Sequence, residues 1–376
     1  MSTARKSKTK ALGAKKKAAS GCSPASFGRS PAGFGRSAEE FERLHVETAN
    51  EAFLRRRVAE LESQALKEKV ATGEALEIIR AVQDSIAQAV PPKFNYRPGN
   101  KSKSPCVHVL HLTDIHYGEV VVADEIDGFG EYNPEIAERR TEALARMVIN
   151  KTKAQRAAYN VPELHIIGTG DYISGGIHPE LKVTNAFPEP VQAVRCGYML
   201  GAMFAGFAPW FKQVTVDMIT LDNHGRLTRK PQAAQGGLNN WGYVVAEVAK
   251  QHVAKIKNIR VNVHAKPSAL IPVGPERYLA FHGHQIRGWA GKPYYGFDRR
   301  AAMEAIKRMG AADAGFTKLL LGHFHHGVDA DIWKLGGSMS GTNAFDASCG
   351  RHSKPHQTSW FVHPKHGEFD WTRWWL

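Results

Sequence analysis

Aspartate, asparagine and histidine residues recur along the last two-thirds of this chain, each time directly after a run of aliphatic residues. Such a run predicts a buried strand, and the polar residues after it then lie at the strand's carboxyl end. Strand ends on one edge of a sheet lie close together, and carboxylate, amide and imidazole groups gathered there are ligands for divalent metal ions. The sequence therefore predicts a metal site built from five loops. These loops contain Asp114 and His116; Asp171; Asn223 and His224; His282 and His284; and His323 and His325.

The order of these loops resembles the calcineurin-like metallophosphoesterase superfamily, whose pattern is D-x-H, G-D, G-N-H-D/E, H and G-H-x-H. The resemblance covers about residues 107–376, and in look it is nearest to phage and bacterial members related to SbcD-like nucleases or phosphodiesterases. It implies an α/β fold, a two-sheet sandwich flanked by helices, that hydrolyses phosphoesters. It also implies the ligands: Asp114, His116 and His325 for one metal, Asn223, His282 and His323 for the other, Asp171 between them, and His224 as proton donor.

Phosphate ester hydrolysis needs these residue types for chemical reasons. Two divalent cations about 3.5–4 Å apart can hold the nonbridging oxygens and generate hydroxide at neutral pH, so we expect a metal-bound hydroxide as nucleophile. A carboxylate such as Asp171 can join two ions, and neutral imidazoles complete each shell without cancelling the positive charge. We expect Mn²⁺ first, with Fe, Zn²⁺, Mg²⁺ or Ni²⁺ as alternatives. His284 is an alternative to His282 as ligand.

Two residues beside His224 depart from the family pattern. The glycine before the asparagine is Asp222 here, and the acid after the histidine is Gly225. That acid normally orients the catalytic imidazole. We therefore expect either that Asp222 orients His224 and is itself a catalytic residue, or that the general acid is weaker. An alternative is a nucleic-acid-binding protein with a vestigial metal site.

Two further residues are candidates for substrate binding. Arg226 follows the Asn-His loop, and its guanidinium fork fits phosphate oxygens. His178 lies in the turn after Asp171, where Gly175 permits unusual backbone angles. The Asp-Arg-Gly of Ser/Thr protein phosphatases is absent after Asp171. We expect a phosphodiesterase or nuclease acting on nucleic acid, with a small-molecule nucleotide phosphodiesterase or phosphatase as the alternative.

Composition and charge bound the class of protein. The chain has 376 residues, 43% of them hydrophobic, and a formal net charge of +14. No apolar run is long enough to cross a bilayer, and no apolar segment follows the basic N-terminus as in a secretory signal, so we expect a cytoplasmic protein without membrane contact, in a bacterium or a phage-infected host. Residues 1–36 carry Lys and Arg but no acid. We expect a disordered tail that binds nucleic acid phosphates.

The remaining chain divides into three parts. Residues 37–92 predict a helical arm of two amphipathic segments separated at Thr72-Gly73, and its apolar stripe needs a partner: the catalytic domain, a second copy or another protein. We expect a linker at residues 93–105, and the resemblance implies a metallophosphoesterase domain at residues 106–376. In that domain the pattern predicts strands at 107–112, 163–168, 214–220, 259–264, 277–281 and 317–321 and helices near 134–156, 189–206, 239–255 and 298–309, then short strands after residue 326.

Overall fold

The computed structural model describes residues 38–88, 104–231, 234–287, 293–311 and 313–376. The chain forms two units, Met1–Tyr96 and Arg97–Leu376, each of which is considered by itself. The basic tail expected at 1–36 and most of the expected linker lie outside the described residues. Among those that are described, no helix is both long and apolar enough to cross a membrane.

The elements follow one another in this order: α1 (Ala38–Gln88), β1 (Pro105–Leu112), η1 (Ala123–Ile126), α2 (Pro134–Gln155), β2 (Asn160–Gly168), α3 (Leu181–Thr184), α4 (Glu189–Phe207), η2 (Ala208–Trp210), β3 (Gln213–Ile219), α5 (Trp241–His252), β4 (Ile259–His264), β5 (Ala269–Val273), β6 (Glu276–Phe281), α6 (Tyr294–Arg308), β7 (Lys318–Leu321), β8 (Val328–Asp329), β9 (Trp333–Leu335), α7 (Ala344–Ser348), β10 (His356–His363) and β11 (Gly367–Trp375).

The described part of the first unit, residues 38–88, is one helix of 51 residues, α1, where two segments were expected. The expectation of a break at Thr72-Gly73 is wrong. One glycine inside a helix costs only about 1 kcal/mol relative to alanine, and the Thr72 hydroxyl donates to the carbonyl of Glu68 one turn earlier, at 2.7 Å. Helical geometry therefore continues through the glycine.

The second unit is an α/β sandwich of two sheets, as expected. One sheet has the order β11-β10-β1-β2-β3-β4, and the other has the order β5-β6-β7-β9-β8. Strands β1 to β4 are parallel, and β6 and β7 are parallel to each other. Their carboxyl ends therefore meet at common edges, where the candidate ligand loops begin.

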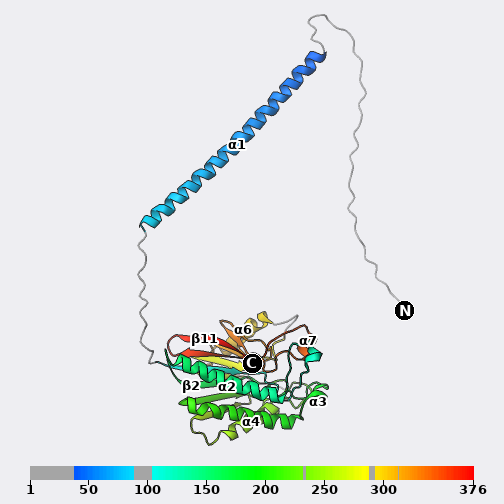
Figure 1. The fold of residues 1–376 in the computed structure, drawn as a ribbon, viewed down its shortest axis with the longest axis vertical. Helices are drawn as coiled ribbons and strands as arrows, with labels where there is room; N and C mark the ends of the chain where they lie inside the picture. Colours follow the sequence, from blue (N-terminus) through cyan, green and yellow to red (C-terminus); the bar gives the residue numbers. More distant parts are fainter. Residues whose placement is uncertain (1–37, 89–103, 232–233, 288–292, 312) are drawn as a thin grey trace, which may run out of the picture. The chain divides into compact units, whose positions relative to one another are not determined.

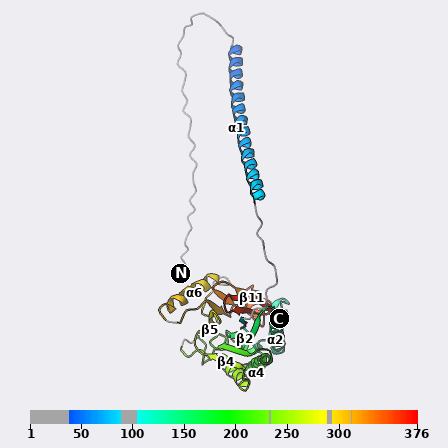
Figure 2. The same cartoon turned by 90° about the vertical axis from the view of Figure 1, so that its left-hand side faces the viewer.

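Three apolar layers hold the sandwich together. Between the sheets, Val109, Ile167 and Ile219 of the six-stranded sheet pack with Tyr278 and Leu320 of the five-stranded one. The outer face of the first sheet packs against α2, α4 and α5. The outer face of the second packs against α6. Figures 1 and 2 show α2 and α4 on one side of the sheets and α6 on the other.

The expected strands and long helices are all present, with ends shifted by a few residues. Periodicity missed β5, a five-residue strand whose proline Pro272 is an exposed residue. It also missed the short helices α3 and α7, which are too short to show a helical repeat. Of these, α7 matters for the site.

Candidate metal centre

The candidate ligand loops are joined to one another by hydrogen bonds that their backbone amides donate. The amides of Asp114 and His116 donate to the carbonyls of Gly170 and Asp171, at 3.1 and 3.0 Å. The amide of His323 donates to both carboxylate oxygens of Asp114, at 3.0 and 2.9 Å. This last contact joins the loop after β1 to the loop after β7, so loops from both sheets form one edge of the sandwich.

The backbone of the ligand loops is strained. Among the described residues, nine non-glycine residues have positive φ, and five of them are expected metal ligands. Left-handed backbone is uncommon outside glycine, and it persists only where surrounding contacts enforce it, most often at functional sites. The φ angles are 50° for Asp114, 50° for His116, 47° for Asp171, 71° for His323 and 53° for His325.

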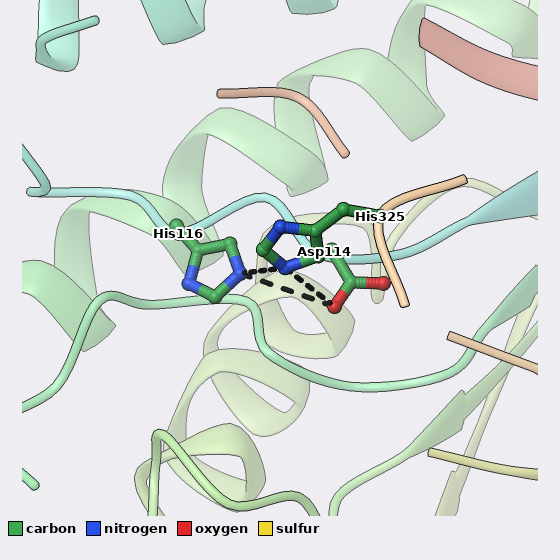
Figure 3. Close-up of side chains that lie close together, drawn as sticks. All are labelled: Asp114, His116 and His325. Carbon is green, nitrogen blue, oxygen red and sulfur yellow. Dashed lines mark hydrogen bonds and ion pairs between the residues drawn. The ribbon is translucent and has the colours of Figure 1, made fainter. Parts of the chain in front are cut away.

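Asp114, His116 and His325 form the first of three neighbouring clusters (Figure 3). Nε2 of His116 and Nε2 of His325 lie 3.0 Å apart, and Oδ1 of Asp114 lies 3.9 and 3.5 Å from them. All three side chains are buried to at least four-fifths. Two ring nitrogens and a carboxylate oxygen that point at one place form a donor set for a divalent cation.

Asp171 is shared by the other two clusters. One consists of His116, Asp171 and His224, and the other consists of Asp171, His282 and His323; within each, the ligand atoms lie within 4.8 Å of one another. Oδ2 of Asp171 is 2.9 Å from Nε2 of His282. Asp171 therefore lies between the two groups of histidines, where a carboxylate can bridge two ions.

Asn223 provides a test of whether the residues fit a second metal. Its side-chain oxygen Oδ1 is buried and has no hydrogen-bond partner. A buried carbonyl-type oxygen without a partner costs about 1–3 kcal/mol, and a cation would satisfy it. Asp171, His282 and His323 bring ligand atoms within 4.8 Å of one another, and the unpaired oxygen of Asn223 is consistent with the prediction that it joins this set.

Burial and neighbouring charges shift the pKa values of the candidate ligands. Burial lowers the pKa of His116 and of His323 well below the usual range, so both rings are neutral, as metal binding requires. Burial alone would raise the pKa of Asp171, but the neighbouring His282 and His224 hold that pKa well below its usual range.

Burial would lower the pKa of His282 and of His325 too, but Asp171 beside His282, and Asp114 and Asp346 beside His325, outweigh it and raise both pKa values above the usual range. Metal binding at these two rings would therefore release protons.

The ring of His224 lies beside the first cluster, 4.5 Å from the ring of His116 between centroids. Its Nδ1 is 2.6 Å from the backbone carbonyl oxygen of Ser174. A carbonyl oxygen only accepts, so Nδ1 donates, and Nε2 is the ring nitrogen that remains for proton transfer. This contact depends on Gly175, which has a φ of +66° and where a Cβ would lie 1.9 Å from the carbonyl oxygen of His224. The ring is oriented by a carbonyl that sequence patterns do not reveal.

Asp222, expected to orient that ring, makes different contacts. Its Oδ2 accepts from the amide of Asp171 at 2.8 Å, and its Oδ1 accepts from the amide of Gly225 at 2.8 Å and from Nδ2 of Asn240 at 3.0 Å. Any influence of Asp222 on His224 therefore acts through the loop backbone. A Cβ at Gly225 would lie 2.1 Å from Oδ1 of Asn240, so Asp222 and Asn240 occupy the space that the family's acid would need.

Three polar residues that sequence analysis did not single out support the site. Nδ1 of His325 lies 3.1 Å from Oδ2 of Asp346 in α7. Nδ2 of Asn343, which caps α7, donates to Oε1 of Glu119 at 2.9 Å. The other oxygen of Glu119 is buried without a partner, and burial raises the pKa of this carboxyl. The Asn-x-x-Asp spacing indicates a helix cap, but nothing in the sequence indicates its contact with His325.

The two expected substrate contacts lie at the margins of the site. Arg226 donates from Nη1 to the carbonyl of Asn223 at 3.0 Å and from Nε to that of Thr228 at 3.2 Å. His178 is exposed and stacks on Phe345 of α7 with 6.4 Å between ring centroids. Both therefore remain predictions as phosphate-binding residues.

Comparison with known proteins adds little. No protein-family model matches the sequence, and no curated protein matches it. Vacuolar protein sorting 29 from Cryptosporidium parvum is similar in structure, at 11% identity and a TM-score of 0.32 over 72% of this chain and 99% of that one. A predicted phosphoesterase from Streptococcus pneumoniae shows 11% identity and a TM-score of 0.24 over 48% and 91%.

A third similar structure is the sulfate thiohydrolase SoxB from Thermus thermophilus, at 11% identity and a TM-score of 0.28 over 77% of this chain and 57% of that one. Likenesses at this level carry no argument about function. The function of this chain has to be inferred from its own residues.

Proposed function

We propose that the protein is a phosphoester hydrolase that uses two divalent metal ions. The observation that supports this most is the position of Asp171, which belongs to a cluster with His116 on one side and to a cluster with His282 and His323 on the other. A shared carboxylate between two sets of imidazoles is suited to a pair of ions. Asp114 and His325 complete one set, and Asn223 completes the other.

Two ions held there would neutralise charge on the phosphoryl oxygens and make water a nucleophile at neutral pH. The protein's own contribution to proton transfer is His224. Because its Nδ1 donates to Ser174, the proton it can transfer is the one on Nε2, which it would give to the oxygen that leaves phosphorus. Asp114 and Asp171 keep the loops in register through their hydrogen bonds to the amides of His323 and His224.

The test is hydrolysis of bis(p-nitrophenyl) phosphate by metal-stripped protein to which Mn²⁺, Mg²⁺, Zn²⁺, Ni²⁺ or Fe²⁺ is added back. We expect turnover with Mn²⁺ or another of these ions and none in EDTA. Bound metal, measured by plasma mass spectrometry, should approach two ions per chain. A protein that binds no metal and has no turnover with any ion would be a binding protein, and the proposal would be wrong.

We further propose that the physiological substrate is a nucleic acid, on the basis of charge. Residues 1–36 contain nine Lys or Arg and no acid: Arg5, Lys6, Lys8, Lys10, Lys15, Lys16, Lys17, Arg29 and Arg36. Contacts between such a tail and phosphates release counterions and give a steep dependence of affinity on salt. Removing these residues should weaken DNA or RNA binding and flatten the salt slope while the rate on the aryl phosphodiester is kept. Unchanged nucleic-acid binding would favour a small-molecule phosphodiesterase.

A further inference from the structure

A cavity of about 300 Å³ lies beside the second set of candidate ligands. Asn223 is part of its wall, so the cavity adjoins the place where a phosphoryl group would bind. Its size is at the lower end of the range for ligand pockets, about 300–1,000 Å³. It can hold one ring system and not several linked residues.

The wall of the cavity combines apolar surface with polar groups, among them the Asp222 carboxylate and the amides of Asn239 and Gln285. Pro231, Pro267 and the exposed Thr228 contribute to it, together with Arg226 and His284. The two hydrogen bonds from Arg226 to loop carbonyls fix its guanidinium in the wall. Apolar faces with hydrogen-bonding groups at one side suit a flat heterocycle, which offers apolar faces and a polar edge.

His284 also lies in the wall of the cavity. Its Nδ1 is buried and has no hydrogen-bond partner. The residue belongs to none of the three ligand clusters, although its ring centroid lies 5.6 Å from that of His282. Buried polar atoms in native proteins nearly always have a partner. This nitrogen is closed off from solvent, so a ligand in the cavity would reach it only if the ring turned.

We propose that this cavity binds a nucleoside that stays attached to the phosphorus during hydrolysis, which makes the protein a phosphodiesterase. This inference rests on the proposed function. In the reaction the oxygen of water forms a bond to phosphorus, the bond to the leaving oxygen breaks, and His224 protonates that oxygen. The second ester bond, to the nucleoside in the cavity, remains intact. Hydrolysis of a phosphomonoester retains no second ester group, so the cavity would have no role in the reaction of such a substrate.

The test compares two substrates with the same leaving group, methyl p-nitrophenyl phosphate and thymidine 5′-(p-nitrophenyl phosphate), in the presence of Mn²⁺. The nucleoside ester should have at least about a tenfold higher kcat/KM, which corresponds to about 1.4 kcal/mol. Thr228→Trp should fill the cavity from its exposed edge and reduce this preference to near one. Leu227→Trp is the matched control, since Leu227 is 56% exposed, belongs to the same loop and is not part of the wall.

Binding gives a second measurement that does not depend on turnover. Saturation-transfer NMR with thymidine 5′-monophosphate and metal-free protein should detect contact with the thymine ring in wild type and in Leu227→Trp, and not in Thr228→Trp. Turnover of the methyl ester without preference for the nucleoside, or thymidine 5′-monophosphate binding that Thr228→Trp retains, would overturn this inference alone. No turnover of either ester with any metal would instead overturn the proposed function.

A second inference comes from α1, which carries an apolar heptad pattern with two polar positions at its centre. Leu54, Val58, Leu61, Ala65, Glu68, Thr72, Ala75, Ile79 and Val82 follow one another at alternating spacings of four and three residues. More than three heptads of this kind are typical of a coiled coil. The large apolar side chains of the pattern are about half exposed: Leu54 59%, Val58 53%, Leu61 49%, Ile79 51% and Val82 51%.

We infer that a second copy of this helix covers the seam as a parallel coiled coil. A copy matches the seam in length and register. In that arrangement Arg57, at a g position, lies opposite Glu62 of the second copy at the following e position, which is a favourable charge pair. The polar residues Glu68 and Thr72 at the centre of the seam lower the stability of the coiled coil. The apolar residues on either side of them therefore supply most of the free energy of association.

The test is the mass of the full chain in analytical ultracentrifugation. Wild type should be a dimer, and Leu61→Asp should be a monomer at the same concentration. Leu66→Asp is the matched control, because Leu66 is 63% exposed and lies outside the seam. A monomeric wild type, a Leu61→Asp protein that is still a dimer, or an equal effect of both substitutions would overturn the inference.

Discussion

The second unit contains two groups of aspartate and histidine residues. They are similar in composition but differ in backbone conformation and in hydrogen bonding. One is the candidate metal centre. The other, which we call the strand cluster, consists of His165 on β2, Asp217 on β3 and His264 on β4. Nε2 of His165 and Nε2 of His264 each lie 2.6 Å from an oxygen of Asp217, and Asn262 donates to that carboxylate at 3.0 Å.

In the strand cluster, the carboxylate of Asp217 finds hydrogen-bond partners within the cluster. In the candidate metal centre, some polar atoms that could bind a metal have no hydrogen-bond partner. Residues of the strand cluster lie within regular strands, and none has positive φ. In the metal centre five ligands are left-handed, two ring nitrogens face each other and Oδ1 of Asn223 has no partner. Backbone strain and unpaired atoms therefore distinguish the candidate metal centre from the strand cluster, although both contain aspartate and histidine.

We expect the largest difference between the two groups when Asp171 and Asp217, the buried aspartate of each group, are replaced by asparagine. Asp171→Asn should abolish metal-dependent turnover and should also abolish the rise in Tm on adding Mn²⁺. In wild type, Mn²⁺ at 100 times its Kd should stabilise by about 2.7 kcal/mol. Asp217→Asn should keep both the turnover and the Mn²⁺-induced rise in Tm. If the two variants respond alike to Mn²⁺, the distinction is wrong.

Within the metal centre, His224 should behave as a proton donor and not as a ligand. His224→Ala should lower kcat by about 10²–10⁴ while the metal content stays the same. The loss should be smaller for p-nitrophenyl esters than for alkyl esters, because nitrophenolate needs little protonation when it leaves. An equal loss on both kinds of ester would assign His224 another role.

Asp346 should affect the metal site through His325. A carboxylate bonded to the far nitrogen of a ligand histidine fixes its orientation, and its loss typically lowers metal affinity about 10–100-fold. Asp346→Asn should therefore raise the Kd for Mn²⁺ by such a factor, as measured by calorimetry. Asp331→Asn, an exposed carboxylate before β9, is the control. Equal affinities for both variants would mean that the contact at 3.1 Å does not act on the metal.

The smallest effect concerns the strand cluster and is one of stability. Burial would raise the pKa of Asp217, but the hydrogen bonds from His165 and His264 outweigh it and hold that pKa below its usual range. A depressed pKa adds stability above the unfolded value of about 3.9, and this stability is lost as the pH falls through the folded value. Asp217→Asn should cost about 1–3 kcal/mol at pH 7. The difference in unfolding free energy, measured in urea, should shrink below pH 4; a constant difference would contradict this.

Much of the domain can be predicted from its sequence because the strands that lead to the candidate site are largely buried and mostly apolar. In β7, Leu319, Leu320 and Leu321 are buried, and the ligand loop begins at the next residue. Long helices such as α2 show enough turns to reveal a repeat. Elements of two to five residues, such as β8 and α7, show none, and their positions depend on tertiary contacts.

The residues around the ligands were harder to predict for a related reason. The orientation of His224 depends on a backbone carbonyl, and backbone groups are the same at every position of a sequence. Asp346 lies 21 residues after the histidine it supports, and its short helix shows no periodicity. Asp222 was recognised as unusual, but its partners are amides and Asn240, which only the folded loop brings together.

The hydrogen bonds between Asp114 and the amide of His323 join residues 209 positions apart. Neither half of the domain can therefore complete the first cluster, and the ligand set exists only after the two sheets have closed on each other. Such distant pairings form late, because a long loop must be ordered before the contact is made. Metal added during refolding should consequently leave the early rate unchanged and slow unfolding instead. A nascent chain could complete the first cluster only after His325 has been synthesised.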